Sequence, residues 1–216
     1  VYALGDLKAA GLRVVSSTAG WGPIAPPHYA YLQDKRNGAT LATIAGGHTL
    51  AMVEAVVGAF AEVSALNSIL QGTVEIAGTQ ETVARTCADH MLIVGRHSSG
   101  CVSSVEIIGG ADIPLRFELR GSDGVLEISG HHPGGYQCGR LTVTTSRPSD
   151  PQPACPFTAL QGNPLNVAQL WARFEADIRS GARSIPDFDT AARLTRLLDA
   201  IECSSDEGRT IPLEPH

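Results

Sequence analysis

The sequence predicts an α+β domain with a large, mainly antiparallel, open-faced sheet and helices packed on one face. The expected elements run strand, helix, strand, a block of closely spaced strands and then two amphipathic helices, an order typical of α+β folds. One strand of the block, Leu115–Arg120, alternates Leu, Phe and Leu with Arg, Glu and Arg. One face of its sheet must therefore meet water or a partner.

The composition indicates a single globular domain over residues 1–216. A hydrophobic content of 43% supports a substantial core, and a formal charge of -6 argues against a nucleic-acid surface. No apolar run reaches the ~18 residues that a membrane-spanning helix needs, and we expect a cytoplasmic protein. An odd number of cysteines without C-x-x-C spacing favours reduced, structural thiols over disulfides or a zinc site. They are Cys87, Cys101, Cys138, Cys155 and Cys203.

The first half of the chain predicts a strand, a helix and a strand after a short helical start. Ala3–Ala10 reads as a helix ending at Gly11, and we interpret residues 1–11 as the remnant of an interdomain helix. Strands are expected at residues 12–18 and 60–69. Residues 71–86 read as a loop with a short edge strand at Thr73–Ile76.

The second half predicts further strands and the two helices. Strands are expected at residues 89–96, 101–108, 125–129 and 141–145, with an edge segment at 211–213. Five prolines make residues 146–164 a surface excursion. Asn166 is expected to cap a helix through Ile178, and Asp187 or Asp189 a second helix through Ile201. The apolar stripe of the first helix is Val167, Leu170, Trp171, Phe174 and Ile178.

The principal candidate site is Gly46-Gly47-His48, which opens a helical run that stops at Gly58. Two glycines allow a close backbone approach, and a histidine follows at once. At a helix N-terminus the dipole disfavours imidazolium, so His48 would be a neutral base or a hydrogen-bond partner for a hydroxyl. The alternative is a capping or packing histidine at a tight turn.

A second group of candidates precedes His48. The segment Trp21–Tyr31 carries three prolines, which exclude regular structure, and its aromatic rings either wall a pocket or pin the loop to the core. Polar residues that follow it would contact a polyol or an acid, or lie in a solvated turn. The candidate substrate-binding residues are Trp21, His28, Tyr29, Tyr31, Lys35, Arg36 and Thr43. Neighbouring His131 and His132 point opposite ways on a strand, so no metal site is expected.

Four segments carry a family resemblance: Leu7–Ser17, Asn37–Leu50, Glu118–Ile128 and Pro186–Ile201. In order and spacing they resemble the C-terminal domain of the glucose–fructose oxidoreductase, inositol dehydrogenase and MocA family. The match is nearest to the branch that contains the fungal repressor of galactose genes. It covers nearly the whole chain.

The resemblance implies a substrate domain without its cofactor domain. Complete family members place a Rossmann domain first, with a catalytic Lys in an E-K-P motif, and neither stands in this sequence. His48 matches the histidine of the family's D-x-x-x-H motif, but the Asp position is Ile44 and the acidic position after the histidine is Ala51. We expect no cofactor on this chain alone, and NAD(P) only with a separate N-terminal domain.

These observations leave three functions open. The first is a substrate-binding and oligomerisation domain of a sugar or polyol oxidoreductase, unable to transfer a hydride alone. The second is a non-catalytic regulatory protein like the galactose repressor. The third is a cofactor-independent isomerase or cyclase that uses the pocket at His48. In each case we expect a small-molecule ligand, and a homodimer through the open sheet face.

Overall fold

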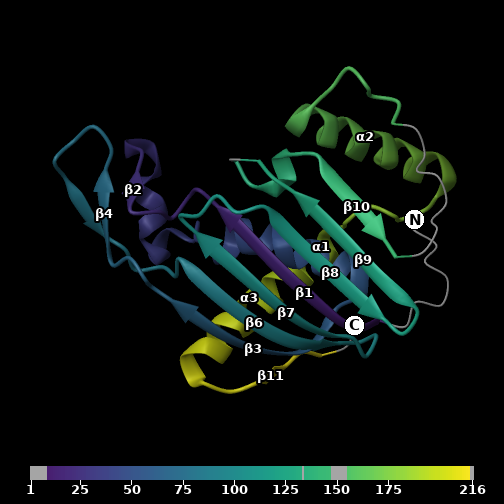
Figure 1. The fold of residues 1–216 in the computed structure, drawn as a ribbon, viewed down its shortest axis with the longest axis horizontal. Helices are drawn as coiled ribbons and strands as arrows, with labels where there is room; N and C mark the ends of the chain where they lie inside the picture. The colour runs from purple at the N-terminus through teal and green to yellow at the C-terminus, as the bar shows by residue number, and fades with distance from the viewer. Residues whose placement is uncertain (1–8, 133, 147–154, 215–216) are drawn as a thin grey trace.

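The computed structural model describes residues 9–132, 134–146 and 155–214, and its centre is one eight-stranded sheet (Figure 1). The strand order is β10-β9-β8-β1-β7-β6-β3-β11. In chain order the strands are β1 (Ala9–Thr18), β3 (Phe60–Ser68), β6 (His90–His97), β7 (Val102–Gly109), β8 (Leu115–Gly121), β9 (Gly124–Gly130), β10 (Leu141–Thr145) and β11 (Ile211–Pro212). All neighbours pair antiparallel except β1 and β7. The predicted α+β fold is confirmed.

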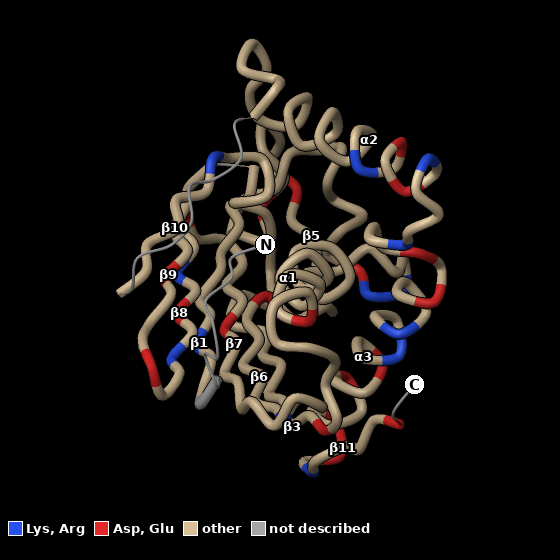
Figure 2. The backbone as a smooth tube through the Cα atoms, turned by 90° about the vertical axis from the view of Figure 1, so that its right-hand side faces the viewer, with Lys and Arg blue, Asp and Glu red and all other residues tan. Residues whose placement is uncertain are grey.

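Two helices cover one face of the sheet (Figure 2). They are α1 (Gly47–Val57) and α3 (Phe188–Glu207), and Asp187 caps α3 by accepting the backbone N–H of Thr190. The inward residues of the strands and the apolar stripe of α3 form the core beneath them. Its largest fully buried apolar side chains include Phe117, Leu41, Leu50, Met91, Ile93, Ile107, Leu115, Leu197 and Ile201.

The C-terminal half of α3 also protects a sheet edge. The prediction ends this helix at Ile201, but it continues to Glu207. The hydroxyls of Ser204 and Ser205 accept the N–H groups of Ala65 and Asn67 in β3, each at 2.9 Å. These bonds occupy donors that β11 leaves unpaired, because β11 pairs only with residues 62–63.

The opposite face of the sheet has no helix over it among the described residues (Figure 2). Its register places Leu66 opposite Leu92 and Glu62 opposite Arg96, and it places Glu118 opposite Arg13. Leu66 is 58% exposed and Val94 is 53% exposed. The predicted open face is therefore confirmed. It carries exposed apolar side chains on β3 and β6 and charged side chains on the central strand β1 and its neighbour β8.

A smaller three-stranded sheet lies beside the large one and is tied to it by a buried guanidinium. It consists of β2 (Ile24–Ala25), β4 (Thr73–Ile76) and β5 (Thr82–Ala84). The strand predicted at Thr73–Ile76 is confirmed, but it is the middle strand of this sheet and not an edge. The Arg85 side chain donates to Asp89 at 2.6 Å, to Gln33 at 2.9 Å and to the Gly22 carbonyl at 2.6 Å. Asp89 in turn accepts the N–H groups of residues 70 and 71.

Two expectations for the first half of the chain are wrong. Ala9–Gly11 belongs to β1 instead of a helix, while residues 1–8 lie outside the described part. The proline segment holds β2 and a 3₁₀ helix, η1 (Pro27–Gln33), instead of an irregular loop. Prolines are compatible with η1 because they stand at its start, where an N–H has no intrahelical acceptor.

The helix predicted from Asn166 is α2 (Gly162–Ser180), which begins five residues earlier, with Gln161 as N-cap. Pro164 falls in its first turn, where the missing N–H costs nothing, so the proline that marked a loop lies inside the helix. The rest of the predicted excursion includes residues 147–154, outside the described part. The apolar stripe of α2 does not face the core: Trp171 is 63% exposed and Ile178 is 68% exposed.

Replacing Arg85 by alanine should destabilise the fold by about 3–5 kcal/mol, because it removes one partner of a buried ion pair. The Arg85 and Asp89 side chains are 0% and 5% exposed, whereas the Arg36–Asp34 pair is largely exposed on its arginine side. Urea unfolding would measure the change, with Arg36→Ala as the matched control. Equal losses in the two variants would contradict the assigned role of Arg85.

Candidate functional site

His48 lies inside a continuous helical run and not at its start. A π-helical turn, η3 (Ala42–Gly46), leads directly into α1, and the Gly46 N–H donates to the Leu41 carbonyl at 2.8 Å. Gly46 and Gly47 have helical φ values of -61° and -54°. The glycines open α1 as the sequence predicts, with Gly46 as its N-cap and Gly47 as its first residue. The π turn continues the helical backbone before them, so His48 does not lie at a free helix N-terminus.

The close approach that the glycines permit is internal. A Cβ on Gly46 would lie 3.3 Å from the Leu41 carbonyl and 3.6 Å from Ile107 of the sheet. A Cβ on Gly47 would meet nothing within 4 Å. Gly46 therefore serves the packing of the π turn on the core, and Gly47 has no such contact in the described structure.

A cavity of about 800 Å³ opens beside His48. Its walls come from α1, from the 3₁₀ turn η4 (Tyr136–Cys138) and the start of β10, from residues 155–160, and from the first turns of α2. The lining residues are His48, Met52, Tyr136, Gln137, Gly139, Arg140, Leu141, Cys155, Phe157, Thr158, Leu160, Leu165, Asn166 and Gln169.

Among the described residues, no carboxylate lines the cavity. Arg140 is the only Lys or Arg in that described lining. Three side-chain amides and the His48 ring offer hydrogen-bonding groups. Beneath His48, Thr49 is fully buried and bonds Ser16 at 2.9 Å and the Ala45 carbonyl at 3.0 Å, which fixes α1 on β1. The arrangement suits binding of hydroxyls or an anion, but it supplies no acid partner for a proton relay.

Tyr136 forms a rigid wall of the cavity. Burial raises its pKa to about 12, so the phenol stays protonated at neutral pH. Its hydroxyl is shielded from solvent and has no hydrogen-bond partner in the described structure. The ring therefore shapes the cavity while its polar atom points into the protein.

The aromatic candidates lie elsewhere. Trp21 is buried in the core, where its indole N–H donates to the Leu32 carbonyl at 3.2 Å. The rings of His28 and Tyr29 stack on each other at 4.3 Å, and both side chains are exposed, as is Tyr31. None of these residues lines the His48 cavity.

The remaining candidates also lie outside the cavity. The backbone N–H of Lys35 donates to Thr86, and Arg36 pairs with Asp34 at 2.6 Å. The bonds from Arg36 lower the Asp34 pKa to about 2. The Thr43 hydroxyl accepts the Thr40 N–H and donates to the Gly38 carbonyl, so it ties the π turn to the residues before it.

The sequence analysis missed most of the cavity wall. Residues 155–160 were predicted to be part of a surface excursion, and no role was predicted for η4, yet both segments border the cavity. The available signal was an aromatic residue, Tyr136, directly after two glycines. The amides of α2 were missed because Asn166 was assigned to a cap; its side chain instead donates to the Gln137 carbonyl.

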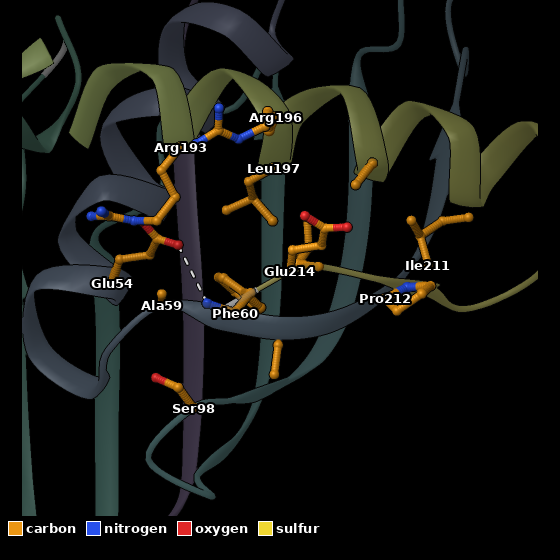
Figure 3. Close-up of a pocket in the computed structure, with 13 residues that line it drawn as sticks. Glu54, Ala59, Phe60, Ser98, Arg193, Arg196, Leu197, Ile211, Pro212 and Glu214 are labelled. Atoms are coloured by element: carbon orange, nitrogen blue, oxygen red, sulfur yellow. Dashed lines mark hydrogen bonds and ion pairs between the residues drawn. The ribbon is translucent and has the colours of Figure 1, made fainter. Parts of the chain in front are cut away.

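A second cavity, of about 690 Å³, lies between α3 and the strands β3 and β11 (Figure 3). Glu54 from α1 reaches its inner end and accepts the Phe60 N–H at 3.3 Å and the Arg193 side chain at 3.2 Å. These bonds join α1, β3 and α3. No residue proposed from the sequence lines this cavity.

The described residues include neither a candidate metal site nor a candidate membrane-spanning helix. No three His, Cys, Asp or Glu side chains there are grouped to hold a metal ion. No helix among these residues is long and apolar enough to cross a membrane.

Comparison with solved structures finds the same fold in Gal80p and in oxidoreductases. A super-repressor mutant of Gal80p from Saccharomyces cerevisiae matches with a TM-score of 0.76 and 20% identity, over 94% of this chain and 57% of that one. Gal80p from Kluyveromyces lactis gives 0.71 and 22%, over 94% and 55%. An oxidoreductase domain protein from Kribbella flavida gives 0.76 and 18%, over 96% and 60%. The chain thus spans less than two thirds of the proteins it matches.

The open-faced sheet with α1 and α3 on one side defines the class: a domain of the kind found at the C-terminus of Gal80p and of oxidoreductases related to it. The family model described as "Gal80p, C-terminal domain" matches residues 3–130, which is more than half of the chain. The chain belongs to this family. Comparison with curated protein sequences found no match.

Gly47→Ala should stabilise the protein by about 0.5–1 kcal/mol, because alanine fits a helical φ and nothing stands within 4 Å of its Cβ. The Gly46→Ala variant should be less stable than Gly47→Ala, because its Cβ would lie only 3.3 Å from the Leu41 carbonyl oxygen. Thermal unfolding of both variants would test the order. A Gly47→Ala variant less stable than Gly46→Ala would show that the tight approach lies at Gly47.

Proposed function

We propose that this chain is the ligand-binding and self-associating domain of a protein built like the sugar and polyol oxidoreductases, and that it does not transfer a hydride by itself. The observation that supports the proposal is His48 in a cavity of about 800 Å³ whose described lining residues include no carboxylate. A base that passes its proton onward needs an acceptor, and the two sequence positions where one would stand hold Ile44 and Ala51.

The ligand is a small molecule with hydroxyl groups, either neutral or carrying an acid group. Amide side chains and His48 can each bond a hydroxyl, and Arg140 can pair with a carboxylate or a phosphate. Met52, Phe157 and Leu160 supply apolar contact for its carbon skeleton. This chain alone binds no cofactor, and NAD(P) would come with a separate N-terminal domain.

A regulatory role is the second candidate. It is favoured by the same missing carboxylate, because a pocket that binds a small molecule without a proton relay reports on that molecule without converting it. In that case the cavity is a sensing site, and binding changes the affinity for a partner protein. Turnover of a polyol by the protein containing this domain would contradict it.

His48→Ala should weaken ligand binding about tenfold, the cost of one lost hydrogen bond to a ligand. Gln169→Trp should abolish binding by filling the cavity. Calorimetric titration with sugars, polyols and sugar acids would measure both, and Tyr29→Ala, which lies outside the cavity, should bind like the parent chain.

Two outcomes would contradict this proposal. One is oxidation of any of these compounds by the 216-residue chain with added nicotinamide cofactor. The other is a loss of binding in Tyr29→Ala together with normal binding in Gln169→Trp, which would place the ligand at η1.

We also propose that the open sheet face forms a twofold dimer. The exposed side chains Leu66, Leu92 and Val94 adjoin one another across β3 and β6, and such a patch is typical of an interface. The Arg96–Glu62 pair at 3.2 Å borders it and would remain at the rim.

Leu92→Arg should therefore abolish association through the sheet, since it places a charge at the centre of an apolar patch. Sedimentation velocity at micromolar concentration would show half the parent mass or less. Ile24→Arg, at a residue that is also exposed but lies on the small sheet, is the control and should keep the parent mass. Retention of the parent mass in Leu92→Arg would exclude this interface.

A further inference from the structure

Helix α2 is attached to the rest of the protein mainly through its ends. Near its start Asn166 bonds the Gln137 carbonyl. Near its end the Asp177 carboxylate accepts the N–H groups of Ser184 and Ile185 and the Ser184 hydroxyl, at 2.7–3.1 Å. Asp177 is the helix's only buried residue. Between these anchors α2 lies beyond β10 at the periphery of the molecule (Figure 1).

The exposed side of α2 is its apolar side. Five large apolar residues recur at spacings of three and four, so they form one stripe along the helix. Their exposed fractions are 51% for Val167, 50% for Leu170, 63% for Trp171, 40% for Phe174 and 68% for Ile178. The inward side carries smaller contacts, such as Ala168 and Ala172. A helix gains its stability by burying such a stripe, which here is uncovered.

We propose that α2 pairs antiparallel with α2 of a second copy of this chain, about a twofold axis between Ala172 and Arg173. Reversing the helix about that point pairs four of the five stripe residues with one another and places the fifth, Leu170, opposite Glu175. Val167 of one copy then faces Ile178 of the other, and Trp171 faces Phe174. Residues that match in this reversed way make a surface complementary to itself, as a twofold interface requires.

The exposed area is sufficient for a specific contact. At roughly 150–250 Å² for a whole aromatic side chain and less for an aliphatic one, the exposed fractions amount to about 500 Å² per copy. Two copies bury about 1,000 Å², which reaches the lower limit for a biological interface. Trp171 and Phe174, in edge contact at 5.7 Å, lie at its centre, where aromatic anchors contribute most.

The charges beside the stripe do not oppose the pairing. Glu175 and Arg179 form an ion pair at 2.6 Å within their own helix. The twofold places Glu175 opposite Leu170 and Arg179 opposite Asn166, so neither charge faces a like charge. The pairing uses a surface separate from the open sheet face and depends on no ligand. The two interfaces together give assemblies larger than a dimer.

Trp171→Arg tests the pairing directly and should halve the parent mass in sedimentation velocity. Trp171 is exposed, so the variant should keep the parent's thermal midpoint. In the Leu92→Arg background the α2 pair should persist as a dimer, and the double variant should be a monomer. An unchanged mass for Trp171→Arg in both backgrounds overturns the pairing, whatever the fate of the sheet interface or of ligand binding.

Cysteine cross-linking tests the antiparallel register. The double variant Val167→Cys/Ile178→Cys should form a disulfide-linked dimer under mild oxidation, whereas Val167→Cys alone should not. Phe188→Cys, which is 92% exposed on α3, controls for collision between surface thiols, and the parent chain controls for its own cysteines. Equal cross-linking in Val167→Cys alone would indicate a parallel pair and contradict the proposal.

Discussion

The central position of β1 is the constraint on which the remaining structure depends. β1 pairs parallel with β7 and antiparallel with β8. The two halves of the sheet are therefore joined only when this first described strand pairs with strands that lie about 100 residues later in the chain. Its inward side chains Leu12 and Val14 lie in the core, and Ser16 bonds Thr49 next to His48. Its outward Arg13 lies on the open face. The same strand therefore fixes the helix that carries the site and the surface proposed for assembly.

Local patterns predicted the elements well, because alternation and capping are written in adjacent residues. Leu141–Thr145 and Thr73–Ile76 match the structure residue for residue, and Asp187 caps α3 as expected. The failures came from context. A π turn continues the helix through Gly46 and Gly47, and no local signal distinguishes it from a helix start. The prolines near the starts of η1 and α2 were predicted to prevent helical structure, although proline is compatible with the first turn of a helix.

Of the site residues predicted from the sequence, only His48 lines the cavity, and the residues around it were not predicted. His48 borders a cavity, but its partners come from segments 90–120 residues later, and sequence proximity favoured the wrong neighbours in η1. Aromatic residues on a proline segment suggested a wall; Trp21 instead fastens that segment to the core. The α2 stripe was assigned to the core because periodicity reports that a face is apolar, without reporting what covers it. In this chain we infer that a second copy does.

The central claim is that the cavity at His48 binds a hydroxylated small molecule. Amide NMR of the isotope-labelled chain, titrated with sugars, polyols and sugar acids, tests it most directly because it locates binding without assuming chemistry. The account predicts shifts at His48, Arg140 and Gln169, with little change at Tyr29 and Arg36. Shifts centred on residues 28–36, with none at His48, would contradict it.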